Sequence, residues 1–337
     1  MHKDCLSEKS IEKLSSDQSF MVSIVISNYN GEKHLLECLS SLMQLDYPLY
    51  EVIVIDAGST DNSVAIIKHD FPKVRVVEKG KIGIGEAINC GIALAQGEFI
   101  VFDLNNDDIV DKKWLSNLIQ VIANSPDVGV VCGKRFQYGS NKILDSVGGN
   151  ISFFTGNTLP IGHNKYSIMY NVQMEIDYAP VIATRREILE KVGLCDPVYY
   201  IYHEDSDFCL RVKRFGYKIV FVPSAAYWHK GSSTIGQQYS RKSYYYSSRN
   251  QIRFVLKNFP LSFMFIALFY SVVLKTIHDF PVLVPPIGKT VTRFSPFFRE
   301  YTWVKNDSTL IRVRVAAILW NVKNLKNTIM ARYQNLR

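Results

Sequence analysis

Four short apolar runs, separated by helical patterns, limit most strongly what this chain can fold into. They are rich in β-branched residues and span residues 21–27, 51–56, 74–78 and 99–102. Runs of this kind are typical of strands that are buried on both faces. Because strands that alternate with helices form parallel sheets with right-handed crossovers, we predict an α/β fold with a mainly parallel sheet flanked by helices.

Polar motifs follow three of these runs. The letters NYN come after the first run, DAGS begins at the last residue of the second, and NNDD follows the fourth. Because open α/β sheets bind ligands at the carboxyl ends of their strands, we expect these motifs to line one cleft. The glycines at Gly83 and Gly85 resemble a dinucleotide fingerprint, but they follow the third run and lack the downstream acid. A dehydrogenase therefore stays open only as an alternative.

An oxygen-rich turn follows the fourth run. Its polar side chains are Asp103, Asn105, Asn106, Asp107 and Asp108. Hard oxygen ligands suit Mg²⁺ or Mn²⁺ better than soft metals do. Since Mg²⁺ takes few carboxylates from a protein and other ligands from substrate phosphate and water, the turn predicts a nucleotide diphosphate as the ligand. The alternative is a turn that only caps the helix after it.

An acidic cluster opens a later helix. Glu204, Asp205 and Asp207 precede or begin the apolar spacing of DFCLRVKRF, and Gly216 ends the pattern. Carboxylates are favourable at a helix N-terminus, so one of them could simply be the N-cap. A single cap does not account for three carboxylates within four residues beside an aromatic run, and we therefore expect a functional site there. The aromatic run consists of Tyr199, Tyr200 and Tyr202.

A strand-like run ends at Trp228 and His229, 24 residues after Asp205. A lone histidine is more often partly buried and hydrogen-bonded than a metal ligand. Together with the oxygen-rich turn and the carboxylates, His229 is predicted to be a metal ligand beside the same cleft.

Several motifs, in the right order, resemble the family 2 glycosyltransferases of the GT-A fold, and most of all their rhamnosyltransferase-like branch. The resemblance extends over residues 21–258. The segments that carry it are VSIVISNYNGEKHLLECLSSL, VIDAGSTDNS, GIGEAINCGIALAQGEFI, LNNDDIVD, TRREILEKVGLCD, HEDSDFCLRVKRFGYKI, VPSAAYWHKGSS and YYYSSRNQIRFVLKN. It implies the nucleotide-diphospho-sugar transferase fold, with a C-terminal helical appendage.

The resemblance also implies roles for individual residues. Asp205 matches the catalytic base. Asp107 matches the metal-binding carboxylate of the family's D-x-D motif, and Asn105 stands where the first aspartate of that motif is common. His229 matches the third metal contact. The nucleotide is expected at Ser27, Tyr29 and Asp56, with Asp107 beside its diphosphate.

These roles imply metal-dependent, inverting hexosyl transfer with Mg²⁺ or Mn²⁺ as the cofactor. The donor is a nucleotide-diphosphate sugar, and the acceptor is a hydroxyl group of a glycan or polyprenyl-linked molecule in cell-surface polysaccharide synthesis. Asp205 would take the proton of the acceptor, and a pKa raised by Glu204 and Asp207 would suit neutral pH. The alternatives are a non-catalytic sugar-nucleotide- or glycan-binding protein on the same fold, a dehydrogenase and a nucleotidyltransferase.

Charge is distributed unevenly along the 337 residues. Residues 1–229 contain 22 Lys and Arg against 28 Asp and Glu, and residues 230–337 contain 17 against 3, so the net charge is +8. The six cysteines form no C-x-x-C pair, which indicates thiols in a reducing compartment. The N-terminal residues lack the apolar core of a signal peptide. We expect residues 1–20 to be a flexible extension of a cytoplasmic protein.

The basic region of residues 259–337 is predicted to be helical and to contact the inner face of the cell membrane. Its apolar run of 14 residues, 261–274, is shorter than the roughly 20 that cross a bilayer. Residues 310–333 combine apolar residues with cations such as Arg312 and Arg314, which favours a helix in the interface of an anionic membrane. The alternative is a pair of helices packed on the catalytic domain, residues 21–258. Nucleic acid is not an expected partner, because no recognised motif is present.

Overall fold

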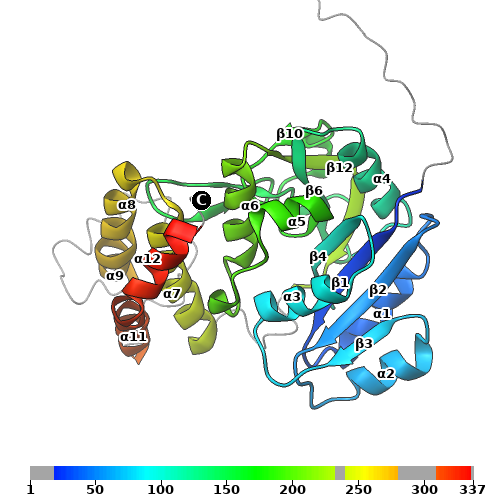
Figure 1. Cartoon of the computed structure of the whole chain (residues 1–337), viewed down its shortest axis with the longest axis horizontal. Coiled ribbons are helices and arrows are strands. Elements are labelled where there is room, and N and C mark those ends of the chain that lie inside the picture. Colours follow the sequence, from blue (N-terminus) through cyan, green and yellow to red (C-terminus); the bar gives the residue numbers. More distant parts are fainter. Residues whose placement is uncertain (1–18, 232–239, 280–308, 335–337) are drawn as a thin grey trace, which may run out of the picture.

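A mixed sheet forms the centre of the protein (Figure 1). The computed structural model describes residues 19–231, 240–279 and 309–334. The strands of the sheet are β1 (Val22–Asn28), β2 (Tyr50–Asp56), β3 (Arg75–Glu78), β4 (Phe99–Asn105), β5 (Asp108–Val110), β6 (Val128–Gln137), β7 (Leu144–Ser146), β10 (Met174–Glu175), β11 (Ile182–Arg185) and β12 (Lys218–His229). Their order is β10-β12-β6-β11-β4-β1-β2-β3, with β5 paired to β12 and β7 paired to β6. A separate hairpin consists of β8 (Gly149–Ile151) and β9 (Thr158–Pro160).

The first four strands form a parallel part of the sheet. β1 pairs in parallel with β2 and β4, and β2 pairs in parallel with β3. The strands coincide within a few residues with the four apolar runs, and they are connected by α1 (Glu32–Leu42), α2 (Ser63–Asp70) and α3 (Ile84–Leu94). The predicted alternation of strands and helices is therefore confirmed.

The other half of the sheet mixes strand directions. β11 lies between β4 and β6 and is antiparallel to both, whereas β12 is parallel to β6 and antiparallel to β5 and β10. The pairing of β12 with β5 places His229 opposite Asp108. This register brings together two segments that are far apart in the sequence.

Alternate residues of β1 face opposite sides of the sheet and belong to two cores. Ile24 lies in one core with Leu39 of α1, whereas Val25 lies in the other with Ile88 of α3. A Cβ atom on Gly91 of α3 would lie 2.2 Å from a methyl carbon of Val25, so this helix can approach the sheet only because that position is glycine. Packing on both faces therefore holds the central strands in place.

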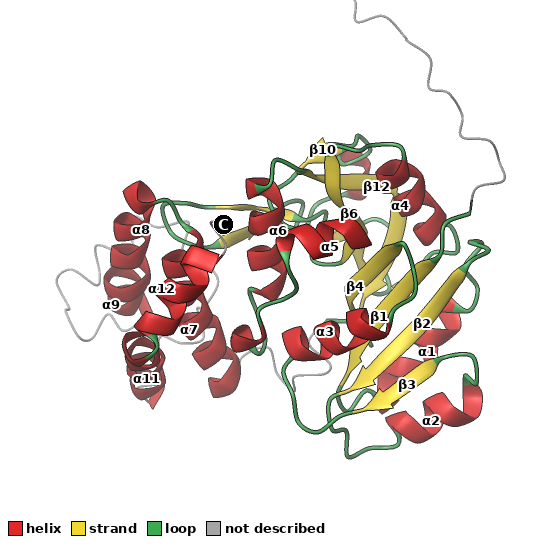
Figure 2. Ribbon diagram, viewed as in Figure 1, coloured by secondary structure: helices red, strands yellow, loops and turns green. Residues whose placement is uncertain are grey.

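The remaining helices flank the sheet or form a group beside it (Figure 2). They are α4 (Trp114–Ala123), α5 (Arg186–Val192), α6 (Glu204–Arg214), α7 (Arg241–Asn258), α8 (Leu261–Leu268), α9 (Lys275–Asp279), α11 (Thr309–Lys323) and α12 (Leu325–Gln334). A π-helical turn, η3 (Phe269–Leu274), joins α8 to α9, and short 3-10 turns occur at η1 (Ser167–Met169) and η2 (Pro197–Tyr199). The helices from α7 onward make up the group beside the sheet.

Polar contacts hold α11 and α12 to the helices next to them. Arg314 of α11 is 0% exposed and donates a hydrogen bond to the carbonyl oxygen of Ser271 in η3. Arg253 of α7 donates to Thr328 Oγ1 of α12 at 2.8 Å. These contacts support the packed alternative for this region, and they show that Arg314 does not belong to an exposed cationic flank.

Within the described residues, no helix is both long enough and apolar enough to cross a bilayer. The division into residues 21–258 and 259–337 stays a prediction. Most of the expected N-terminal extension, residues 1–18, and residues 280–308 of the C-terminal region lie outside the described residues.

Candidate functional site

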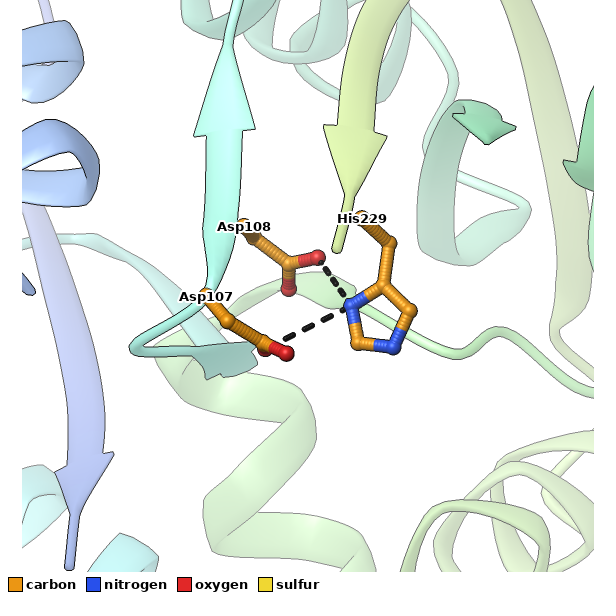
Figure 3. A group of neighbouring side chains, drawn as sticks. All are labelled: Asp107, Asp108 and His229. Carbon is orange, nitrogen blue, oxygen red and sulfur yellow. Dashed lines mark hydrogen bonds and ion pairs between the residues drawn. The ribbon is translucent and has the colours of Figure 1, made fainter. Parts of the chain in front are cut away.

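Two carboxylates and one imidazole meet where the turn between β4 and β5 faces the end of β12 (Figure 3). His229 Nδ1 lies 2.8 Å from Asp108 Oδ1 and 3.5 Å from Asp107 Oδ1. One ligand atom from each residue lies within 4.8 Å of the other two, and both carboxylates are buried. Carboxylate oxygens suit Mg²⁺ and Mn²⁺, and imidazole suits transition metals. The residues present therefore fit a divalent cation.

Asp108 contacts both the backbone of the turn and the imidazole ring of His229. Its Oδ2 accepts a hydrogen bond from the Asn105 N–H at 2.9 Å, while its Oδ1 contacts His229. Because an ionised carboxylate only accepts, the contact directs the Nδ1 proton of His229 toward Asp108, as carboxylates behind metal-binding histidines do. Burial lowers the pKa of His229, but Asp108 and Asp107 more than compensate, so the pKa is raised.

The three clustered residues differ in one member from the predicted ligands. Asp107 and His229 are brought together as expected, and Asp108 joins them. Asn105 occupies the last position of β4 and contributes its backbone N–H to the turn. Its role as a metal ligand stays a prediction.

Ser27 and Tyr29 lie at the end of β1, next to the ends of β2 and β4. In the parallel register Ser27 is opposite Asn105. Within the described residues, Ser27 Oγ is buried without a hydrogen-bond partner, and the side chain of Tyr29 is exposed. The Tyr29 side chain is therefore accessible at this edge of the sheet, and the Ser27 hydroxyl is a buried polar group that a ligand could satisfy.

Asp56 and Asn28 form a polar network at the same edge. Asp56 Oδ1 accepts from Asn28 Nδ2 at 2.8 Å, and Asp56 Oδ2 accepts from the Ser59 N–H at 2.9 Å, so this carboxylate holds the loop after β2. Asn28 Oδ1 in turn accepts from Asn106 Nδ2 at 2.7 Å. A Cβ on Gly31 would lie 2.2 Å from Asn28 Oδ1, so only glycine fits there. Asn28 and Asn106 belong to two of the motifs that were expected to line one cleft. The hydrogen bond between them was not predicted, because a contact between residues this far apart leaves no local pattern.

A second acidic group consists of Asp103, Glu204 and Asp205, at the end of β4 and the start of α6. Burial raises the pKa of all three. Repulsion from Asp205 raises the pKa of Glu204 further, to about 8. Asp103 Oδ2 and Glu204 Oε2 are buried without a hydrogen-bond partner in the described part of the chain. Carboxylates whose pKa is raised in this way are suited to proton transfer near neutral pH.

Asp207 belongs to a different network, although it is only two residues from Asp205. Its carboxylate lies 3.0 Å from Arg211 Nε and 2.9 Å from Lys257 Nζ, and it accepts from the hydroxyl of Tyr199 at 3.0 Å. Burial alone would raise its pKa, but Lys257 and Arg211 hold the pKa of Asp207 below its usual value. The contribution of Asp207 to the raised pKa of Asp205 stays a prediction. Burial is the main cause of that shift.

Neither Asp205 nor Asp207 is the N-cap residue of α6. The N-cap is His203, whose side chain makes no capping hydrogen bond, although Asp205 Oδ1 accepts a hydrogen bond from the Ser206 N–H at 2.6 Å within the first turn. Tyr200, Tyr202 and His203 have φ angles of 66°, 69° and 72°, a conformation that is costly for residues other than glycine. Asn250 of α7 stabilises this loop, because its Nδ2 donates to three of the loop's carbonyl oxygens at 2.6 to 2.9 Å. The position of Asp205 therefore depends on α7.

Arg135 links the two groups of carboxylates electrostatically. It lies on β6, beside β12, and forms an ion pair with Asp145 at 2.5 Å. Burial is the largest single influence on the pKa of both Asp205 and His229. The pKa is raised in each case, and the charge of Arg135 opposes part of each rise. Asp145, and to a lesser extent Asp108, raises the pKa of Arg135 against the effect of burial. One guanidinium thus lies within reach of both the predicted base and the carboxylate–imidazole cluster. No local sequence pattern marked Arg135 for this position.

Sequence comparison relates the chain to known enzymes. The model of the family described as Glycosyl transferase family 2 matches residues 23–193, about half of the chain. An uncharacterized glycosyltransferase of Nostoc sp. is 30% identical over 183 residues, which cover 52% of this chain and 54% of that protein. The poly-beta-1,6-N-acetyl-D-glucosamine synthase of Staphylococcus epidermidis is 28% identical over 240 residues, which cover 64% of this chain and 51% of that protein. The chain thus spans about half the length of the curated relatives it matches.

Structural comparison concerns the fold. A mannosyltransferase from Pyrobaculum calidifontis, solved in complex with GDP-Man and Mn²⁺, is similar with a TM-score of 0.56 and 16% identity. The similarity covers 91% of this chain and 88% of that one. The predicted GT-A fold, with its C-terminal helical part, is confirmed.

Proposed function

The chain belongs to glycosyl transferase family 2, and on this premise we propose that it is an inverting, metal-dependent hexosyltransferase. It moves a sugar from a nucleotide-diphosphate donor to a hydroxyl group of a glycan or polyprenyl-linked acceptor in cell-surface polysaccharide synthesis. One observation supports this most. Asp205, whose pKa is raised by burial, and the carboxylate–imidazole cluster both lie within the electrostatic reach of Arg135. Transfer from a sugar diphosphate needs a proton acceptor and a cation site close together.

Asp205 is the catalytic base in this proposal. The oxygen of the acceptor hydroxyl attacks the anomeric carbon of the donor while the bond to the diphosphate oxygen breaks, and the hydroxyl proton passes to a carboxylate oxygen of Asp205. A single displacement of this kind inverts the configuration of that carbon. Burial raises the pKa of Asp205, which makes its carboxylate a better proton acceptor.

Asp107 and His229, through its Nε2, would hold the Mg²⁺ or Mn²⁺ ion, with Asn105 as a further oxygen ligand from the end of β4. The bound ion supplies positive charge for the departing diphosphate. Asp108 acts mainly by orienting His229 through Nδ1. The relative from Pyrobaculum calidifontis, which has a similar fold, was solved with Mn²⁺, and this supports a divalent cation here.

Ser27, Tyr29 and Asp56 would bind the nucleoside of the donor. The buried hydroxyl of Ser27 has no partner among the described residues, so a hydrogen bond from a ligand would satisfy it. Asp56 would act indirectly, through the loop after β2 that its carboxylate holds. GDP-Man bound to the similarly folded mannosyltransferase supports a nucleotide sugar as the donor.

Peripheral contact with the cytoplasmic face of the cell membrane completes the proposal. Along α8 and η3, Leu261, Phe265 and Phe269 recur at every fourth position and are 62%, 69% and 56% exposed. An exposed apolar stripe of this kind on a basic helical region suits the interface of an anionic bilayer. In flotation with phosphatidylglycerol vesicles, Phe265→Ser combined with Phe269→Ser should weaken binding. Unchanged flotation would contradict this contact.

A donor panel tests the enzymatic proposal most directly. The full chain is incubated with individual nucleotide-diphosphate sugars and Mn²⁺, and released nucleoside diphosphate is measured. We expect one donor or a few related donors to be consumed, and we expect EDTA to abolish the release. Release of pyrophosphate would indicate a nucleotidyltransferase, and binding of nicotinamide cofactors would indicate a dehydrogenase. Donor binding without any turnover would favour a non-catalytic binding protein.

A further inference from the structure

An open surface hollow of about 500 Å³, the α7–α11 cavity, lies between the first half of α7 and α11, outside the site described above. Its lining includes Arg241, Lys242, Tyr245 and Tyr246 from α7 and Arg312 and Val313 from α11. The three cations are exposed, and the two tyrosines are partly buried. Three positive charges and two aromatic rings therefore border one opening.

The charge around this cavity is not compensated by the described helices. In residues 240–279 and 309–334 the sequence has eleven Lys and Arg residues and one carboxylate, Asp279. Asp279 accepts a hydrogen bond from the hydroxyl of Tyr244 at 2.7 Å. Within the described residues, five of the eleven cations form no ion pair and no hydrogen bond. These five are Arg241, Lys242, Arg312, Lys323 and Lys326. Three of the five line the cavity.

One wall of the cavity connects to the loop that positions Asp205. The ring of Tyr246 stacks on the ring of Tyr200, with 4.9 Å between centroids and 15° between planes. The guanidinium of Arg249 lies 4.7 Å from the centre of the Tyr246 ring, and its Nη2 donates at 2.6 Å to the carbonyl oxygen of Tyr199. Arg249 is buried and is hydrogen-bonded to the loop before α6. The ring of Tyr246 is therefore held in place, and this wall extends from the cavity toward the start of α6.

We propose that this cavity binds a phosphate or diphosphate group carried by a lipid. Arginine pairs with phosphate through two parallel N–H···O bonds, and lysine adds a point charge. A diphosphate carries two or three negative charges, which would balance the three cations. The tyrosine rings would contact the sugar or the first prenyl unit attached to the diphosphate. The volume is within the usual range of pockets for small ligands.

Two sources could supply this group. One is the diphosphate of a polyprenyl-linked acceptor, which would sit in the cavity while its sugar extends along the Tyr200 wall toward Asp205. This assignment rests on the proposed function. The other is the phosphate of an anionic membrane lipid, which would orient the protein on the bilayer beside the apolar stripe of α8 and η3. The chemistry recognised is the same in both cases.

The test compares two double variants of the full chain. Arg241→Gln with Arg312→Gln removes two charges from the cavity. Lys323→Gln with Lys326→Gln removes two charges from exposed positions of α11 and α12 that do not line it. Thermal unfolding of both variants should match that of the wild type, because all four side chains are exposed. Arg312→Lys serves as the conservative variant, which keeps the charge but loses the two-pronged contact.

Binding of farnesyl diphosphate is measured by calorimetry in EDTA, so that cation-dependent binding at the Asp107–Asp108–His229 cluster does not contribute. Farnesol is the uncharged reference. We expect the cavity pair, Arg241→Gln with Arg312→Gln, to bind farnesyl diphosphate at least about tenfold more weakly than the wild type does. The control pair, Lys323→Gln with Lys326→Gln, should bind it as the wild type does. In a second arm, flotation with phosphatidylglycerol vesicles replaces farnesyl diphosphate. A loss confined to the vesicles assigns the cavity to a lipid headgroup, and a loss with farnesyl diphosphate assigns it to a lipid-linked diphosphate.

Two results would overturn the proposal. One is that the wild type binds neither probe, and the other is that the cavity pair binds both as well as the wild type and the control pair do. Donor turnover, measured in parallel, separates this outcome from a failure of the proposed function. If the cavity pair loses probe binding but the wild-type chain consumes no donor, the proposal for the cavity stands and the proposed transferase function is contradicted. If the cavity pair binds the probes as the wild type does and the wild-type chain consumes donor, only the proposal for the cavity is contradicted.

Discussion

Asp205 and Asp207 lie in the same turn of α6, yet their surroundings are opposite. Asp207 contacts Arg211 and Lys257, and its pKa is lowered. Asp205 faces other carboxylates, and its pKa is raised. Asp207 is fully buried and Asp205 is partly buried, so burial alone does not account for the lower pKa of Asp207. Compensation by cations separates a carboxylate that holds the fold together from one that is poised to exchange a proton.

The largest expected effect comes from removing the charge of Asp205. Asp205→Asn should lower the rate of transfer by about 10³-fold or more, because general-base catalysis contributes roughly 10² to 10⁴-fold. The affinity for the donor should be unchanged, since Asp205 acts on the acceptor. Nucleoside diphosphate release gives the rate, and a donor titration gives the affinity. A variant that keeps its activity would refute the assignment of the base.

The same substitution at Asp207, whose charge is balanced by nearby cations, should affect the stability of the fold. Asp207→Asn leaves Arg211 buried without its counter-charge and Lys257 paired with Asp196 alone, and this should cost about 3 to 5 kcal/mol in the free energy of unfolding. Urea unfolding measures the loss. The matched control is Asp127→Asn, which breaks a surface pair with Lys218 at 2.8 Å and should leave stability nearly unchanged. Equal stabilities of the two variants would show that compensation of Asp207 is unimportant.

Glu204 should make the stability of the protein depend on pH. Its pKa is about 8 in the folded chain, against an ordinary value of 4.5, so the folded state holds a proton that the unfolded state releases. The contribution to stability is complete below pH 4.5 and is lost as the pH rises toward 8. In metal-free buffer, Glu204→Gln should unfold with a smaller loss of stability between pH 5 and pH 8 than the wild type does. Identical slopes would contradict the raised pKa.

The smallest effect is expected at Arg135, whose charge acts on Asp205. Arg135 lowers the pKa of Asp205, so Arg135→Gln should raise that pKa. Asp205 must be ionised to accept a proton, and the acidic limb of the rate profile should therefore move to higher pH, by less than about one unit. The profile of kcat/KM against pH measures this shift, and Arg135→Lys should largely restore the original profile. A shift to lower pH would mean that Arg135 does not act on Asp205 through its charge.

Predictability from the sequence differed between the fold and the site. The strands β1 to β4 and the polar motifs at their ends followed from hydrophobic periodicity, which is a local property. Asp107 and His229 were expected to meet, and they do, because β12 pairs with β5. Asp108 belongs to the oxygen-rich turn that was expected to bind a metal, but it was not among the ligands assigned, since the choice between neighbouring oxygen ligands depends on the conformation of a turn.

The electrostatic environment of the acids was not predictable in the same way. Glu204, Asp205 and Asp207 read as one cluster in the sequence, but only two of them share an environment. The third is neutralised by Lys257, 50 residues away, and by Arg211, one turn further along α6. The role of Arg135 likewise depends on the pairing of β6 with β12.

The amino-acid sequence by itself determined the alternation of strands and helices, the family and the end of the sheet at which polar side chains collect, because periodicity and the order of motifs are written along the chain. Tertiary structure decided which carboxylates are paired with cations, which loop α7 holds, and that a basic cavity opens between α7 and α11. The physical reason is that the energy of a charge depends on what surrounds it in space, and those neighbours are supplied by segments that are distant in the sequence.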